Sequence, residues 1–157
     1  MSFLVTKPAP DFTATAVLAD NSFDEDFTLS SLHGKYVLLF FYPLDFTFVC
    51  PTEILAFDEA LEEFRSRDAE VVGISVDSHY AHAAWKRTHV DDGGIGPIRY
   101  PLVSDLSKEI ARLVEVTSRC ISHGNVVEQG EFQQSLPVPA CRTERVISRF
   151  QGEPVLA

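Results

Sequence analysis

Two continuous apolar runs dominate the hydrophobic pattern and predict buried β-strands. Tyr36–Tyr42 is seven apolar residues in a row, and Glu70–Val76 is a second run of mainly aliphatic residues. Short, unbroken runs of this kind are typical of strands that are covered on both faces. Phe12–Leu18 alternates well enough for a strand with one buried face, and Tyr100–Val103 predicts a further short strand.

Helical periodicity separates these strands. From about Pro51 to Ser66, apolar residues recur at spacings of three and four with acidic residues opposite them, which predicts one amphipathic helix. Asp77 or Ser78 is expected to cap a second helix that fades near His89, and Asp105–Val116 predicts a third. Strands and helices that alternate in this way predict an α/β sandwich with helices covering a largely parallel sheet.

The segments between these elements are predicted to be turns and loops. Asp20–Asp26 is acidic and turn-like, and Asp91–Pro97 is a glycine-rich loop. Ser30 is expected to cap a short helical turn that Gly34 ends.

The last 41 residues differ in kind from the rest of the chain. Residues 117–157 hold four acidic and four basic residues, so the net charge of −10 belongs entirely to residues 1–116. Hydrophobic residues there show no sustained period, and only Val126–Val127 and Arg145–Phe150 predict short elements. We therefore divide the chain into a body, 1–116, and a divergent tail, 117–157, part of which we expect to be loosely ordered.

Composition narrows the classes of partner and compartment. The net charge of −10 and the pI near 4.8 argue against nucleic acid or an anionic membrane as partners. The N-terminus shows no secretory signal pattern, and no apolar run approaches the roughly 20 residues that a membrane span needs. Three widely spaced cysteines, Cys50, Cys120 and Cys141, do not make a disulfide framework. We expect a reducing, cytoplasmic location.

The strongest chemical signal is Cys50 at the junction of a strand and a helix. Pro43 ends the apolar strand because proline cannot donate to a sheet ladder. Pro51 favours the first helical position, which places Cys50 at a helix N-terminus, where unpaired N–H groups and the helix dipole favour a thiolate. Thr47 lies three residues earlier, where its hydroxyl could hydrogen-bond the sulfur. The alternative is a small buried hydrophobe, the commonest state of a free cysteine.

Three other patterns suggest chemistry but lack the context that it needs. His79 and His82 lie three apart on one predicted helix, yet no cysteine or carboxylate stands at a convincing ligand spacing beside them. Gly93–Gly96 follows a helix and runs into a proline, unlike a phosphate-binding loop. Thr47 stands where a Cys-x-x-Cys dithiol would have its first cysteine. We therefore expect neither a metal nor a cofactor.

The segment FYPLDFTFVCPTE, residues 41–53, resembles the active-site signature of peroxiredoxins of the typical two-cysteine, alkyl hydroperoxide reductase type. The resemblance covers about the first 116 residues, and its Pro-x-x-x-Thr-x-x-Cys core is highly specific. It implies a thioredoxin-like sandwich with helices around a central mixed sheet. It also implies reduction of hydrogen peroxide or organic hydroperoxides. In this reading Cys50 becomes a sulfenic acid, Thr47 orients the peroxide and the sulfur, Pro43 shields the thiolate, and Glu53 supports the surrounding hydrogen bonds.

Beyond residue 116 the resemblance fails. The family continues with a Leu-Arg-Gly segment, whose arginine contacts the sulfur, and later with a Val-Cys-Pro motif that carries a resolving cysteine. Neither motif occurs here. Cys120 and Cys141 are only weak candidates for the resolver, and Arg112 and Arg119 are nearby cations outside the family's motif.

The sequence therefore predicts a thiol-dependent peroxidase that an external thiol or disulfide reductase recycles. We expect a homodimer or a higher homo-oligomer, as the resemblance implies. Phe41, Tyr42, Phe46 and Phe48 also crowd aromatic surface around the site. One alternative is a catalytically impaired protein of the same fold that acts as a holdase or interaction module. Another is a thiol–disulfide oxidoreductase, which the lone cysteine of the motif disfavours.

Overall fold

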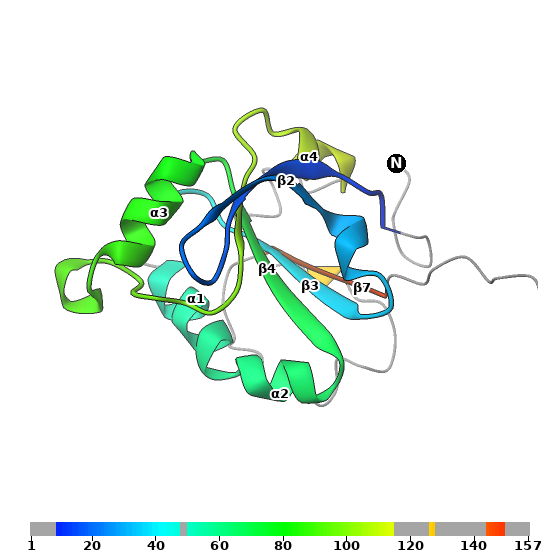
Figure 1. Ribbon diagram of the computed structural model, residues 1–157, viewed down its shortest axis with the longest axis horizontal. Helices are drawn as coiled ribbons and strands as arrows, with labels where there is room; N and C mark the ends of the chain where they lie inside the picture. The colour runs from blue at the N-terminus through cyan, green and yellow to red at the C-terminus, as the bar shows by residue number, and fades with distance from the viewer. Residues whose placement is uncertain (1–8, 48–49, 115–125, 128–143, 150–157) are drawn as a thin grey trace, which may run out of the picture.

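One mixed β-sheet organises the chain (Figure 1). The structure, a computed structural model, describes residues 9–47, 50–114, 126–127 and 144–149, with only the backbone of Cys50 and of the last two segments. The sheet has seven strands in the order β2-β1-β5-β4-β3-β7-β6. The strands are β1 (Thr13–Val17), β2 (Phe23–Thr28), β3 (Tyr36–Phe41), β4 (Ala69–Ser75), β5 (Leu102–Ser104), β6 (Val126–Val127) and β7 (Glu144–Arg149).

Parallel pairing is confined to part of the sheet. β3 pairs with β4, β4 with β5 and β6 with β7 in parallel. β1 is antiparallel to β2 and to β5, and β7 is antiparallel to β3. The helical elements are η1 (Leu29–Leu32), α1 (Cys50–Glu59), α2 (Leu61–Ser66), α3 (His79–Arg87), η2 (Val90–Asp92) and α4 (Glu109–Leu113). The thioredoxin-like α/β fold with a mixed sheet is confirmed, and the largely parallel sheet that the element order predicted is wrong.

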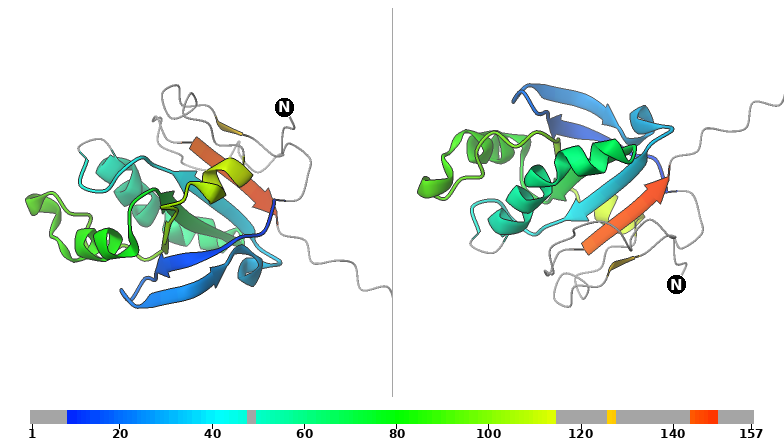
Figure 2. Two further views of the ribbon diagram at one scale, coloured as in Figure 1. Left: turned by 90° about the horizontal axis from the view of Figure 1, so that it is seen from above. Right: turned by 90° about the horizontal axis from the view of Figure 1, so that it is seen from below.

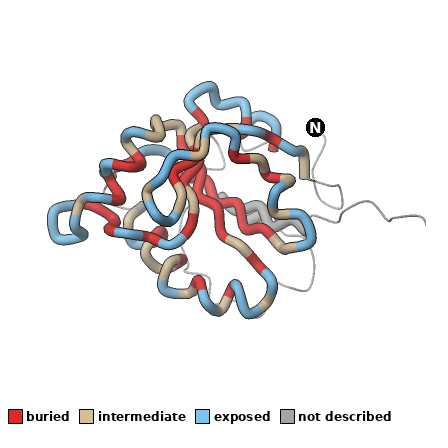
Figure 3. Tube along the Cα trace, viewed as in Figure 1, coloured by how far each residue is buried: buried red, intermediate tan, exposed pale blue. Residues whose placement is uncertain are grey.

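Both faces of β3 are buried, as its unbroken apolar run predicts. Leu38 and Phe40 face a core beneath α1, α2 and α3, while Val37 and Leu39 face a second core beneath α4 and η1. Figure 2 shows α1 and α2 on one face of the sheet and α4 on the other. In Figure 3 the buried residues follow β3 and β4 continuously, whereas those of the helices alternate with exposed ones. The loops that leave β3 and β4 therefore start from strands that are packed on both faces.

Several boundaries differ from the predicted ones. Phe23–Thr28 is a strand although most of it was predicted as a turn, because its backbone pairs with β1 while most of its acidic side chains remain exposed. The predicted helix 51–66 is interrupted at Ala60, although its apolar stripe is buried on both sides of the interruption. Ser30 does not cap η1, whose N-cap is Thr28 without a side-chain bond. Ser78, by contrast, does cap α3, accepting a hydrogen bond from the Ala81 N–H.

The last helix and strand of the body are shorter or shifted. β5 begins at Leu102, two residues later than predicted. α4 begins at Glu109 because the preceding Lys108 is left-handed, with φ of 60°. The Asp105 carboxylate accepts hydrogen bonds from the backbone N–H groups of Ile110 and Ala111, so it holds α4 from outside the helix.

The two short elements predicted in the tail are strands β6 and β7, and β7 pairs with β3 along its length. The boundary at residue 116 stays a prediction, since most of 117–157 lies outside the described residues. No helix in the described part of the chain has both the length and the apolar character that crossing a bilayer requires.

Candidate active site

The loop between β3 and α1 carries the predicted chemistry. β3 ends at Phe41, and Pro43 follows as the exposed first corner of the loop. Because β3 and β4 run parallel, their carboxyl ends lie at the same edge of the sheet, where ligand sites of open α/β sheets usually form. Leu44 and Phe46 in the same loop are 47% and 52% exposed, and Phe46 has φ of 54°. The loop therefore presents its apolar side chains at the surface.

Thr47 is bound to the loop itself. Its hydroxyl donates a hydrogen bond to the Leu44 carbonyl oxygen at 3.1 Å. A hydroxyl has a single proton to donate, so this bond leaves its lone pairs free to accept. The sequence predicted a hydrogen bond between this hydroxyl and the Cys50 sulfur. The Cys50 side chain lies outside the described residues, and that bond stays a prediction.

α1 begins at Cys50, as the Cys-Pro pair predicted. The first turn of a helix leaves backbone N–H groups without intrahelical partners, and these favour an anion. Buried side chains hold α1 to the sheet: Phe57 stacks on Phe40 at 4.8 Å between ring centroids, and the Tyr100 hydroxyl donates to the Ile54 carbonyl at 2.7 Å. The helix start is thus anchored from the core.

Glu53, the predicted supporting residue, lies in the first turn of α1 and is 3% exposed. A buried carboxylate in the first turn suits the positive end of the helix dipole. Its supporting role beside Cys50, and its particular hydrogen bonds, stay predictions.

The loop is fixed by a buried polar network that sequence reasoning missed. His82 of α3 places Nδ1 2.7 Å from Oδ2 of Asp45, and the two side chains are 0% and 2% exposed. The Tyr42 hydroxyl donates to the other oxygen of Asp45 at 2.9 Å. Burial raises the pKa of Tyr42 well above its usual range and the Asp45 charge raises it further, so this phenol keeps the proton that it donates.

One residue of this network, His82, stood out in the sequence, but its role could not be read from the sequence alone. His82 stood out only as a partner of His79 in a metal pair, but in the structure it turns inward to Asp45. His79 instead packs against Phe23 and Tyr80. Within the described ranges, no group of three or more histidine, cysteine, aspartate or glutamate side chains is placed to hold a metal ion.

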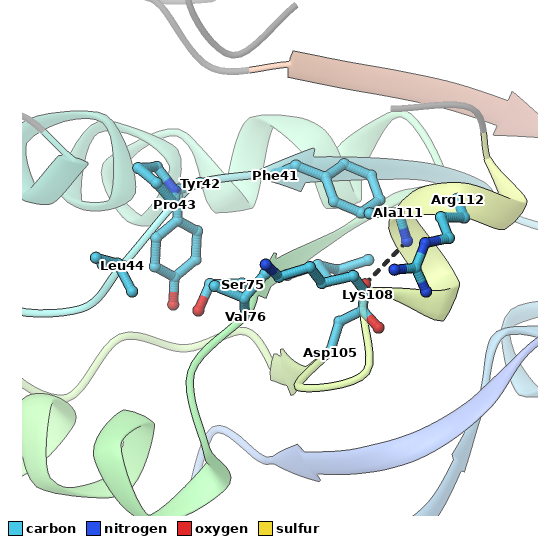
Figure 4. A pocket seen from close by; sticks show the side chains of 11 residues that line it. Phe41, Tyr42, Pro43, Leu44, Ser75, Val76, Asp105, Lys108, Ala111 and Arg112 are labelled. Atoms are coloured by element: carbon cyan, nitrogen blue, oxygen red, sulfur yellow. Dashed lines mark hydrogen bonds between the residues drawn. The ribbon is translucent and has the colours of Figure 1, made fainter. Parts of the chain in front are cut away.

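A cavity of about 420 Å³ adjoins the loop. It is lined mainly by apolar side chains from the ends of β3 and β4 and from α4, with Lys108 and Arg112 as its cations. In Figure 4, Pro43 and Arg112 stand at opposite ends of the cavity. One Arg112 Nη donates to the Ser107 carbonyl at 3.1 Å. Arg112 thus shares a cavity with Pro43, whereas Arg119, Cys120 and Cys141 lie outside the described residues.

Comparison with known proteins agrees with this geometry. The family model for the AhpC/TSA family matches residues 5–135, and this chain belongs to that family. Peroxiredoxin-1 of Gallus gallus is 55% identical over 108 residues, which are 69% of this chain and 54% of that protein. Alkyl hydroperoxide reductase C of Helicobacter pylori is 54% identical over 114 residues, 72% of this chain and 58% of that protein.

The solved structures show the same likeness. The reduced 2-Cys peroxiredoxin of Plasmodium vivax has a TM-score of 0.69 and 54% identity, covering 72% of this chain and 69% of that one. The chain spans little more than half the length of the curated relatives described above. The resemblance to peroxiredoxins is confirmed, and the family model extends it beyond residue 116, to residue 135.

Proposed function

We propose that this chain is a thiol-dependent peroxidase that reduces hydrogen peroxide or organic hydroperoxides through Cys50. The observation that carries the proposal is the position of Cys50 as the first residue of α1, directly after the loop with Pro43 and Thr47. Membership of the AhpC/TSA family and relatives named peroxiredoxin and alkyl hydroperoxide reductase support this type of reaction.

The reaction is a two-electron transfer from sulfur to a peroxide. The Cys50 thiolate attacks the terminal oxygen of R–O–O–H, so that an S–O bond forms while the O–O bond breaks. The departing RO⁻ takes up a proton and leaves as water or an alcohol. Cys50 is left as a sulfenic acid. An external thiol then attacks this sulfur and releases water, and a second thiol equivalent or a disulfide reductase restores the thiolate.

The described contacts suggest how the loop assists. Since the Thr47 hydroxyl already donates to Leu44, its lone pairs are available to accept the O–H of a bound peroxide. This contact would hold the peroxide in line with the sulfur. Pro43 would shield the thiolate from water, as the resemblance implies. Glu53 supports the first turn of α1.

The proposal extends to partners and location. We propose a homo-oligomer, supported by exposed aromatic side chains at Phe23, Phe46 and Tyr80. Phe41 and Tyr42 are buried, so the expectation that they add to this exposed surface is wrong, and Phe48 lies outside the described residues. The acidic charge supports partners other than nucleic acid and anionic membranes. Cysteine usage supports a cytoplasmic location.

Rapid-mixing measurements test the proposed reaction. The rate at which hydrogen peroxide and cumene hydroperoxide are consumed is measured for the unmodified chain and for Cys50→Ser. The matched control is Cys120→Ser/Cys141→Ser, which keeps the proposed nucleophile. We expect Cys50→Ser to lose the reaction and the double variant to keep its first turnover. Peroxide consumption that survives in Cys50→Ser would falsify the assignment.

A further inference from the structure

Asp45 is the one buried side chain among residues 43–47, all of which the structure describes. Pro43, Leu44 and Phe46 are exposed and Thr47 is half-buried. Of these, Phe46 also contacts the core, with its ring centroid 5.8 Å from that of the buried Trp85. The loop must nevertheless keep Thr47 at a fixed place, because reacting groups lose rate steeply when they are displaced by even an ångström. Asp45 is therefore the buried polar residue through which the rest of the fold can fix this loop, in addition to the contact between Phe46 and Trp85.

Contacts to Asp45 come from three separate elements. His82 of α3 lies 2.7 Å from Oδ2, and the Tyr42 hydroxyl at the end of β3 donates to Oδ1. The Asp45 backbone N–H donates to Asp77, just after β4, at 2.5 Å. Both the side chain and the backbone of Asp45 are thus tied to the frame of the sandwich.

His82 is itself held on both sides. Its Nε2 lies 3.3 Å from the Val103 carbonyl oxygen of β5, opposite the nitrogen that faces Asp45. Contacts on both ring nitrogens fix the orientation of the ring, and the Nδ1 contact gives the buried carboxyl group of Asp45 a hydrogen-bond partner.

We propose that His82 is a positioning residue for the peroxidase site: by binding Asp45 it holds the loop that carries Pro43 and Thr47 in the geometry that reacts with peroxide. The inference rests on the proposed function and adds a residue to it. His82 does not touch the reacting atoms and acts through Asp45.

A role in stability alone predicts a different pattern. Well-packed apolar residues can replace a buried polar pair with little loss of stability, whereas removal of one partner leaves the other buried without its hydrogen bond. If the pair serves only packing, replacing both partners should restore both the fold and the reaction. If it positions the loop, that replacement restores the fold and leaves the reaction slow.

The test measures two reactions of Cys50 in the full chain. One is oxidation by hydrogen peroxide, which depends on the geometry of the loop. The other is alkylation by iodoacetamide, quantified on the Cys50 peptide by mass spectrometry, which requires only an accessible thiolate. The variants are His82→Phe, His82→Gln and the pair His82→Phe/Asp45→Leu. The matched control is His79→Phe, on the same helix but packed against Phe23 and Tyr80.

We expect His82→Phe and the double variant to lose about 10- to 100-fold in peroxide rate while alkylation changes less than about threefold. His82→Gln keeps one donor toward Asp45 and should recover part of the rate, and His79→Phe should match the unmodified chain. A double variant that reacts with peroxide at the unmodified rate overturns the inference, even if His82→Phe does not fold. Peroxide and alkylation rates that fall in parallel also overturn it. If the unmodified chain itself does not react with peroxide, the proposed function fails first.

Discussion

Replacing Lys86 with methionine should stabilise the protein. Lys86 of α3 is 1% exposed, and its ammonium group donates to the Leu18 carbonyl oxygen. Burial lowers the pKa of Lys86 from 10.5 to about 8, against the opposing effect of the Asp20 and Asp58 charges. Methionine has a similar length and no charge, so Lys86→Met removes the cost of burying the cation while it keeps most of the packing.

The size of the effect follows from this pKa. A fall from 10.5 to about 8 corresponds to at most about 3.4 kcal/mol, at roughly 1.36 kcal/mol for each tenfold change in proton affinity. We reduce this upper limit to about 2 kcal/mol, because charges buried in proteins are screened more strongly than in a dry, low-dielectric interior. The lost hydrogen bond costs only about 0.5–1.5 kcal/mol, because the Leu18 carbonyl also accepts from the Asn21 N–H. Lys86→Met should therefore raise the free energy of unfolding by about 1 kcal/mol at pH 7.

The lowered pKa of Lys86 also determines how the free energy of unfolding changes with pH. Between about pH 8 and 10.5 the unfolded chain binds more protons at Lys86 than the folded chain does, so the stability of the unmodified protein rises with pH through that window. Urea unfolding followed by circular dichroism at about pH 7 and about pH 10 should show the advantage of Lys86→Met at the lower pH and its loss at the higher one. Lys35→Met is the control, because Lys35 is 45% exposed and pairs with Glu70 at the surface. A variant that is less stable at pH 7, or an advantage that does not change with pH, would refute the reasoning.

Three further predictions concern the site and the assembly. Thr47→Val should slow the reaction of Cys50 with hydrogen peroxide by about 100-fold in rapid-mixing assays, because it deletes the hydroxyl that we propose holds the peroxide. Thr47→Ser keeps this hydroxyl and should retain most of the rate. An unchanged rate in the valine variant would show that Thr47 serves packing alone. Light scattering at micromolar concentration should give a mass above that of one chain, and a strictly monomeric protein would contradict the proposed oligomer. Peroxide-treated protein without reductant should accumulate as Cys50 sulfenic or sulfinic acid in mass spectra; a dominant disulfide to Cys120 or Cys141 would instead identify the tail as a resolving arm.

The strands of the core could be predicted because strands buried on both faces consist of unbroken runs of apolar residues. β3 and β4 lie within one residue of their predicted bounds, and the face that each β3 residue occupies follows from simple alternation. β2 was missed because an edge strand needs only one partner, so its side chains can stay acidic and exposed. The start of α4 was misplaced because Asp105 caps the helix from several residues away, a contact that local spacing does not reveal.

The site could be predicted only as far as it is local in sequence. Pro43, Thr47 and Cys50 share one short segment, so the motif and the helix start were visible together. Asp45 lies in the same segment but gave no signal, because its partner His82 is 37 residues away and the sheet brings them together. A histidine on a helix is compatible with a ligand, a core residue or a surface residue, and only the fold decides among them.

The proposed reaction has two requirements: a cation that stabilises the Cys50 thiolate, and a loop that holds Thr47 in the correct position. A free thiol has a pKa near 8.5, and lowering it to about 6 requires roughly 3.4 kcal/mol of preference for the thiolate. A helix N-terminus commonly supplies about 0.3–1 kcal/mol, so α1 leaves most of this to a cation. Lys108 and Arg112 line the cavity that Pro43 adjoins, and both belong to the α4 region that Asp105 holds in place. The position of the loop has a separate source, the contact between Asp45 and His82. Alkylation of Cys50 reports the first requirement and peroxide reduction reports both, so the ratio of the two rates distinguishes a thiol that lacks charge from a loop that has moved.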